Sequence, residues 1–112
     1  MLVIAKRGDF LKAASARRQG TGSFLLQARN RSDDTTSIRI GFTASKKIGN
    51  AVLRNRAKRR LRAIAQTILV AQGEPGWDYV LVARPDATVT RSYSDLLADL
   101  KTALRSVHRS KS

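Results

Sequence analysis

The sequence predicts an α+β fold, an α/β sandwich in which helices pack on a small mixed central sheet. Three observations predict it. Short segments have strand character, a long segment without Gly or Pro has helical periodicity, and the elements come in the order helix-strand-strand-helix-strand-helix. A chain of 112 residues, 42% of them apolar, can bury one core but not two. Residues 1–112 are therefore expected to form a single domain.

The first part of the chain predicts a short helix and two strands. Residues 8–18 are expected to be helical, with Asp9 as the N-cap and Phe10 on the buried face. Residues 23–29 and 36–44 have β-branched or aromatic side chains in partial alternation with polar ones, which is typical of strands. The polar segment between them indicates a hairpin connection, so these two strands are expected to pair antiparallel.

The second part predicts a long helix, a buried strand and a last helix. Residues 51–71 contain no Gly or Pro, and Gly73 is a natural stop. The apolar residues of this helix recur at helical spacing: Leu53, Ala57, Leu61, Ile64 and Ile68. Residues 78–84 form a continuous apolar run before Pro85, and residues 90–108 are expected to form the last helix, capped by Ser92 or Ser94.

Charge is the strongest global feature. Twenty-two Lys and Arg against eight Asp and Glu give a formal net charge of +14, which destabilises a compact domain unless a polyanion offsets it. Nucleic acid is the expected partner, because the basic segment lacks the apolar face that a membrane-surface helix needs. The chain has no cysteine and no segment with the length of a signal peptide or a membrane span. These features predict a cytoplasmic protein.

The positive charge is concentrated between Lys46 and Arg62. No acidic residue occurs from Thr35 to Gly73, and the cations of the segment are Lys46, Lys47, Arg54, Arg56, Lys58, Arg59, Arg60 and Arg62. On a helix, Arg54, Lys58 and Arg62 share one edge, with Asn55 and Arg59 beyond them and the apolar residues opposite. Like charges at i and i+4, and cations near a helix N-terminus, both destabilise a helix. Phosphate binding explains why they are nevertheless gathered here.

The segment SKKIGNAVLRNRAKRRLR resembles the signature of the protein subunit of bacterial ribonuclease P. The family pattern, SKK, then G-x-A-V, then R-N-x-x-K-R-x-x-R, falls on Ser45, Lys46, Lys47, Gly49, Ala51, Val52, Arg54, Asn55, Lys58, Arg59 and Arg62. The aromatic Phe10 of the first helix and the late Ala83-Arg84-Pro85 also agree with the family.

The resemblance implies a fold, a role and partners. The fold would be ribosomal protein S5 domain 2-like, with a left-handed βαβ crossover that general handedness statistics would not predict. The protein would be an auxiliary subunit without catalytic residues, because the RNA subunit and its bound magnesium ions remove the 5′ leader of precursor tRNA. The implied partners are ribonuclease P RNA and the precursor tRNA leader. No membrane, protein partner or dedicated cofactor site is expected.

The resemblance and the charge pattern together give a set of candidate residues. The residues expected to contact the catalytic RNA are Lys46, Lys47, Asn50, Arg54, Asn55, Arg56, Lys58, Arg59 and Arg62. Those expected beside the leader, in a cleft between the first helix and the sheet, are Phe10, Lys12, Arg17 and Phe24. Ala14 and Gln27 replace aromatic residues found in some relatives, so a strong preference for leader sequence is not carried over.

Other functions are also open to a small basic protein. A ribosomal-type protein that only stabilises folded rRNA is the main alternative. A self-sufficient nuclease is disfavoured, because the acidic residues are scattered and His108 is the sole histidine. A DNA-binding regulator is disfavoured, because the long helix offers few base-reading side chains and no dimer seam.

Overall fold

The computed structural model describes residues 2–109 and has the predicted α+β architecture. In chain order the elements are β1 (Leu2–Val3), α1 (Arg7–Ala14), β2 (Arg17–Gly20), β3 (Phe24–Asn30), β4 (Arg39–Thr43), the 3₁₀ turn η1 (Lys46–Ile48), α2 (Ala51–Gln72), β5 (Trp77–Ala83), α3 (Ala87–Thr90) and α4 (Tyr93–Val107). The strands form one mixed sheet in the order β1-β4-β5-β3-β2. Strand β5 is parallel to β4 and antiparallel to β3.

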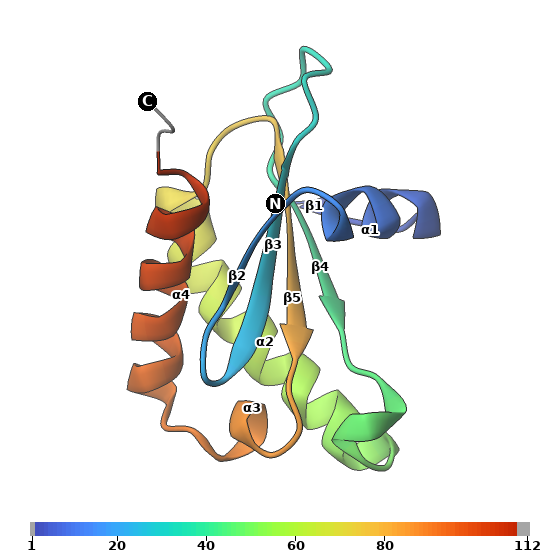
Figure 1. The fold of residues 1–112 in the computed structure, drawn as a ribbon, viewed down its shortest axis with the longest axis vertical. Helices are drawn as coiled ribbons and strands as arrows, with labels where there is room; N and C mark the ends of the chain where they lie inside the picture. The colour runs from blue at the N-terminus through green and yellow to red at the C-terminus, as the bar shows by residue number, and fades with distance from the viewer. Residues whose placement is uncertain (1, 110–112) are drawn as a thin grey trace.

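The sheet has helices on both faces, with α1 on one side and α2 and α4 on the other (Figure 1). The central strand β5 is buried on both faces, because Tyr79 and Leu81 pack in the main core under α2 and α4 while Val80 packs under α1. The α1 side has a much smaller core, Ile4, Ala13 and Val80, against which Phe10 and Val82 pack. Helix α1 therefore covers only part of its face of the sheet.

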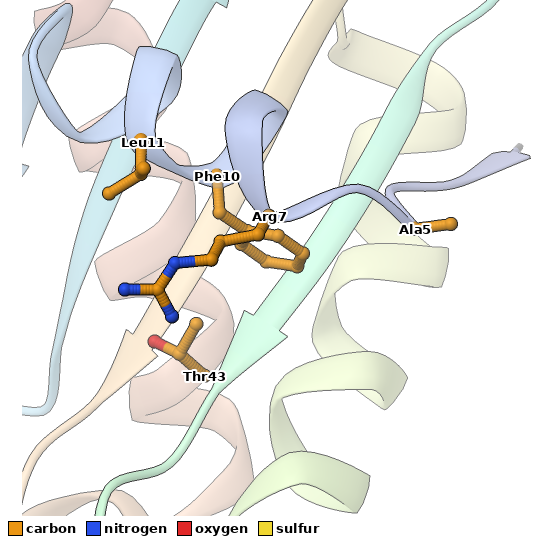
Figure 2. Close-up of a pocket in the computed structure, with 5 residues that line it drawn as sticks. All are labelled: Ala5, Arg7, Phe10, Leu11 and Thr43. Atoms are coloured by element: carbon orange, nitrogen blue, oxygen red, sulfur yellow. The ribbon is translucent and has the colours of Figure 1, made fainter.

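The connection from β4 through α2 to β5 is left-handed, as the resemblance implied. Viewed from the α1 side, both strands run downward, β5 lies to the left of β4, and α2 lies behind the sheet (Figure 2). Parallel strands are almost always connected the other way round. The crossover places the N-terminal end of α2 beside the end of β4.

The prediction that residues 23–29 and 36–44 pair as a hairpin is wrong. Strands β3 and β4 run in opposite directions but do not pair, because β5 lies between them and bonds to both. The physical reason is burial, since β5 is the most continuously apolar strand and the centre of the sheet is where both faces are covered. The connection instead folds on itself through Arg31, whose guanidinium binds Thr35 and the Ser37 carbonyl oxygen.

The first predicted helix is too long. Helix α1 starts after Lys6, with Asp9 in its first turn rather than at the N-cap, and it ends at Ala14. Residues Arg17–Gly20 leave the helix and pair with β3 as an edge strand. Sequence periodicity did not reveal β2, because an exposed edge strand of polar residues has no apolar alternation. The two-residue strand β1 and the one-turn helix α3 were also missed.

The two long helices match their predictions closely. In α2, Ala57, Leu61, Ile64 and Ile68 are buried as expected, Leu53 is half-buried, and Gly73 is the C-cap. Helix α4 begins at Tyr93, after Ser92, whose hydroxyl oxygen accepts a hydrogen bond from the Asp95 N–H. This is one of the two caps that the sequence predicted.

Candidate nucleic-acid interface

The start of α2 is built by a short, closely fitted turn. Ser45 caps η1 by accepting a hydrogen bond from the Lys47 N–H, and Asn50 caps α2 by accepting one from the Leu53 N–H at 3.0 Å. Gly49 between them has a φ of 136°, and a Cβ there would lie 2.7 Å from the Leu53 side chain. The Asn50 side chain, expected at the RNA, therefore has a structural role as a cap, while Lys46 and Lys47 are exposed.

The solvent-facing side of α2 carries the predicted cations. Arg59 lies near the centre of that side, and the exposed residues around it are Asn55, Arg56 and Arg62. Arg54 and Lys58 are half-buried, as expected for the border of a helix whose other face packs in the core. The geometry predicted from helical spacing is confirmed. The segment from Ala63 to Gln72 has no charged residue, so the basic surface ends after three turns.

Two arginines at the border of the basic surface are held against the protein. The Arg62 guanidinium lies 5.5 Å from the ring centroid of Phe42 on β4, a cation–π contact that limits its motion. The Nε of Arg54 is buried and has no hydrogen-bond partner among the described residues. A buried N–H without a partner is costly, so Arg54 has an unused donor at the edge of this surface.

Arg60 has a different role from its neighbours. Its guanidinium donates hydrogen bonds to the carbonyl oxygens of Val89, at 2.6 Å, and Arg91, so it caps the C-terminal end of α3. Arg60 therefore fastens the α3–α4 connection to α2. Arg60 was not among the residues expected to contact the RNA, and this anchoring role agrees with that.

The arginines of the protein fall into two groups by their partners. Those that form ion pairs with aspartates are Arg29, Arg31, Arg39 and Arg91. In the described part of the chain, no cation between Lys46 and Arg62 lies within ion-pair distance of a carboxylate. The acidic groups are thus used inside the fold, and the surface of α2 keeps its full positive charge.

The face of the sheet under α1 is arranged in rows across the strands. Gly41, Val80 and Gln27 are register partners on neighbouring strands, and all three are buried. The next row, towards the C-terminal ends of β4 and β5, is partly exposed to solvent, and we call it the open row. It consists of Thr43, Val82, Leu25 and Gly20. The open row therefore lies beside the edge of α1, and we call the space between them the α1 groove.

A hollow of about 430 Å³ marks the β4 end of this groove. It is lined by Ala5, Arg7, Phe10, Leu11 and Thr43. Figure 2 shows Arg7 extending from α1 towards Thr43 at the end of β4, with the Phe10 ring beside it. The ring rests on Gly41, where a Cβ would lie only 2.5 Å from Phe10 Cε1. Phe10 therefore lies where the sequence placed it, with part of its ring accessible.

The structure contradicts two of the four residues expected at the leader. Phe24 is fully buried in the main core, because its side chain points to the α2 and α4 face of the sheet. Arg17 is on β2, not on the first helix, and its guanidinium points to the same face, where Nη1 donates a 2.6 Å hydrogen bond to the Val107 carbonyl oxygen. Lys12 is exposed on α1 but does not line the hollow.

Sequence reasoning did not identify Arg7, Leu11 and Thr43 as lining residues. Arg7 precedes the segment that was predicted to be helical, so it was not expected on the same element as Phe10. The position of Thr43 depends on the register between β4 and β5, which the incorrect hairpin concealed. Correct pairing of β4 with β5 would have placed Thr43 beside Val82 on the α1 face.

The aromatic cluster at the other end of the sheet is structural. Tyr79 Oη lies 2.7 Å from His108 Nε2 and accepts a hydrogen bond from the Glu74 N–H. Trp77 packs edge-on against His108, at 4.4 Å between centroids. Burial lowers the pKa of His108 and raises the pKa of Tyr79 to about 12. His108 is thus packed between the rings of Trp77 and Tyr79.

No helix in residues 2–109 is both long and apolar enough to cross a membrane. Within the same residues, no three His, Cys, Asp or Glu side chains come together in a way that could hold a metal ion.

Comparisons with known proteins agree over nearly the whole chain. The family model described as Ribonuclease P matches residues 2–108. The ribonuclease P protein component of Ruegeria pomeroyi is 58% identical over 110 residues, which cover 97% of this chain and 88% of that protein. The ribonuclease P protein component of Caulobacter vibrioides is 51% identical over 104 residues, which cover 93% of this chain and 69% of that protein.

Solved structures give the same result for the fold. The RNase P protein of Staphylococcus aureus superposes with a TM-score of 0.77 at 25% identity, and 96% of each chain is covered. That of Thermotoga maritima superposes with a TM-score of 0.69 at 21% identity, covering 95% of this chain and 94% of that one. These similarities extend far beyond the basic segment, to both helix layers and the sheet.

Proposed function

The chain belongs to the ribonuclease P protein family, and we propose that its two candidate surfaces bind different RNAs of that enzyme. The protein is the RNA-binding component of ribonuclease P, the endoribonuclease that removes the 5′ leader from precursor tRNA, and it associates with ribonuclease P RNA. The α2 surface, defined here as η1 and the exposed side of α2 up to Arg62, would bind that RNA. The groove between α1 and the sheet would hold the leader.

RNA binding by the α2 surface is supported by the separation of its unpaired cations from the ion-paired arginines elsewhere in the fold. All the ion-paired arginines lie outside the α2 surface, whose described cations have no carboxylate partner. A helix gains stability from acidic residues spaced among its basic ones, and α2 has none. Phosphates of a folded RNA would supply the missing negative charge and release counterions on binding.

The shape of the α1 side supports the second part. The hollow beside Phe10 and Thr43 combines an accessible aromatic ring with the Arg7 guanidinium. Single-stranded RNA is commonly bound by stacking of a base on an aromatic ring together with cationic contacts to its backbone. Thr43 is separated from η1 by only two residues, so the groove and the α2 surface adjoin. One RNA complex could therefore occupy both.

In this proposal the RNA subunit, and not the protein, cleaves the precursor tRNA. Four aspartates, Asp9, Asp33, Asp78 and Asp99, pair with arginines of the fold, and His108 is bonded to Tyr79. Magnesium ions would be bound by the RNA, and no further protein would be required. The working compartment would be the cytoplasm. A purely structural rRNA-binding role is not favoured by the family relationship.

The assignment of the α2 surface is tested by direct binding to ribonuclease P RNA. Arg59→Ala should weaken binding and lower the slope of log affinity against log salt by about one unit. Lys101→Ala, which removes an exposed cation from α4, is the matched control and should leave both quantities nearly unchanged. An equal effect of the two substitutions would mean that net charge alone, and not the α2 surface, determines binding.

A further inference from the structure

A second hollow lies beside Trp77, at the start of β5. It has a volume of about 440 Å³ and is lined by Ala16, Arg17, Ala28, Arg29, Asn30 and Trp77. Ala28 and Trp77 belong to the α2 and α4 side of the sheet, because they pack in or against the main core. Pockets of roughly 300–1,000 Å³ take small molecules, so this one has room for a single nucleobase. We call it the Trp77 hollow.

Arg17 is held at the edge of the Trp77 hollow by two contacts. Its guanidinium carbon lies 5.5 Å from the centroid of the Trp77 ring, and its Nη1 donates the 2.6 Å hydrogen bond to the Val107 carbonyl oxygen. The indole is half-buried, with part of it packed against the core. Bases of single-stranded RNA stack on aromatic rings and on arginine guanidinium planes. The hollow therefore presents both kinds of stacking surface in fixed positions.

Asn30 adds a polar group to the same hollow. Its Oδ1 accepts a 3.0 Å hydrogen bond from the Ser32 N–H, which fixes the side-chain amide. Because that bond uses only the oxygen, the amide NH₂ group can donate to the edge of a base. The guanidinium of Arg29, in contrast, is paired with aspartates. The Trp77 hollow thus combines a stacking platform with a fixed amide.

A smaller hollow of about 170 Å³ shares Arg17 with the first and is also lined by Arg18, Ser106, Val107 and Arg109. Arg18 and Arg109 are exposed. Within residues 2–109, no carboxylate lies within ion-pair distance of these three arginines. The helix dipole stabilises a cation at the end of α4, and an arginine on an edge strand hinders pairing with another chain. Neither effect explains three guanidinium groups from two elements beside a hollow that contains a tryptophan.

We infer that these two hollows bind one single-stranded segment of ribonuclease P RNA, with a base beside Trp77 and the flanking phosphates on the arginines. We call this site the β2–α4 surface, and it consists of Arg17, Arg18, Asn30, Trp77 and Arg109. It rests on the proposed function, which makes ribonuclease P RNA the partner. Figure 1 shows the start of β5 and the end of α4 at the upper end of the molecule and the start of α2 at the lower end. RNA bound to the α2 surface can therefore reach the β2–α4 surface without crossing the α1 groove.

The contribution of the arginines is tested by binding of the full chain to ribonuclease P RNA. Arg109→Ala should weaken binding about threefold to tenfold and lower the salt slope by ~0.7, as expected for one phosphate of a single strand. Arg109 is exposed, so its substitution should leave the thermal melt unchanged. Lys101→Ala is the matched control, because Lys101 is an exposed cation of α4 that lines neither hollow.

The position of the base is tested by the emission of Trp77, which is the sole tryptophan of the chain. Saturation with ribonuclease P RNA should quench this emission, because a base stacks beside the indole. Arg59→Ala should show the same quenching once it is saturated, since Arg59 belongs to the α2 surface. Inorganic phosphate should not quench it. A solution of N-acetyltryptophanamide with the same RNA corrects for absorption by the RNA.

The possible results separate this inference from the proposed function. If Arg109→Ala bound the RNA as tightly as Lys101→Ala, or if Trp77 emission did not change at saturation, the β2–α4 surface would be excluded. The effect of Arg59→Ala on affinity would still test the α2 surface independently. Quenching by inorganic phosphate alone would also overturn the inference, because it would show an anion site without a base. A wild-type protein that did not bind ribonuclease P RNA would contradict both.

Discussion

Arg39 on β4 and Asp78 on β5 are register partners, and the Arg39 guanidinium binds both carboxylate oxygens of Asp78, at 2.7 and 2.6 Å. Asp78 is fully buried, and Arg31 adds a third hydrogen bond of 2.8 Å. Burial alone would raise the pKa of Asp78, but the bonds from Arg39 and Arg31 outweigh it and hold that pKa below its usual value. Arg39 and Arg29 also pair with Asp9, so the cluster ties α1 to the sheet.

Asp78→Asn should strongly destabilise the protein. The substitution keeps the shape but removes the buried charge that Arg29, Arg31 and Arg39 share. Breaking such a buried pair costs about 3–5 kcal/mol. Urea unfolding at neutral pH measures the change in the free energy of unfolding. Asp34→Asn is the control and should change little, because Asp34 is exposed and forms no ion pair with any residue from 2 to 109. A loss for Asp78→Asn no larger than for Asp34→Asn would contradict the role of the cluster.

The free energy of unfolding should fall as the pH is lowered through the ordinary pKa of histidine. Burial keeps the pKa of His108 below 6.5 in the folded protein, so below about pH 6.5 the unfolded chain binds a proton that the folded chain does not. Denaturation from about pH 7.5 to about 5.5 tests this, since carboxylates stay ionised there. His108→Gln should lose this dependence. A wild-type stability that does not decline over this range would contradict the account.

The neighbouring residues Arg59 and Arg60 of α2 should have different roles, Arg59 in RNA binding and Arg60 in the stability of the fold. Arg59 is exposed, and the structure records no hydrogen bond of its side chain to any described residue, so Arg59→Ala should weaken RNA binding without loss of stability. Arg60 holds two backbone carbonyl groups at the end of α3, so Arg60→Ala should lower the free energy of unfolding by about 1–3 kcal/mol. Thermal or urea unfolding and RNA binding are measured on the same two proteins. The reverse pattern would show that the exposed and anchored residues were assigned incorrectly.

The parts of the fold that could be predicted from sequence are those with a strong local signal. The α2 stripe from Ala57 to Ile68 and the apolar run of β5 are unambiguous, and each lies where expected. The face presented by Arg59 follows from the same helical periodicity. These features depend only on spacing along the chain, which sequence reveals directly.

The errors concern contacts between segments far apart in sequence. Strand order cannot be deduced from alternation, so β5 was not placed between β3 and β4. That error hid the row from Thr43 to Gly20 and with it the shape of the groove. Phe24 was misassigned because periodicity in a strand does not say which face is solvent-exposed. Arg17 was misassigned because β2 has no apolar pattern to separate it from the preceding helix.

The central claim is that the α2 surface binds ribonuclease P RNA and the α1 groove binds the leader. It is tested most directly by titrating the protein into ribonuclease P RNA and measuring the affinity of the assembled enzyme for precursor and for mature tRNA. The Arg59→Ala protein should saturate the RNA only at a higher protein concentration than the wild type. Once the RNA is saturated, the ratio of the affinities for precursor and mature tRNA should equal that of the wild type. Phe10→Ala should assemble normally and lower that ratio about tenfold, as expected for one lost stacking contact. If Phe10→Ala impaired assembly and left the ratio unchanged, or if Arg59→Ala lowered the ratio at saturation, the division between the two surfaces would be contradicted.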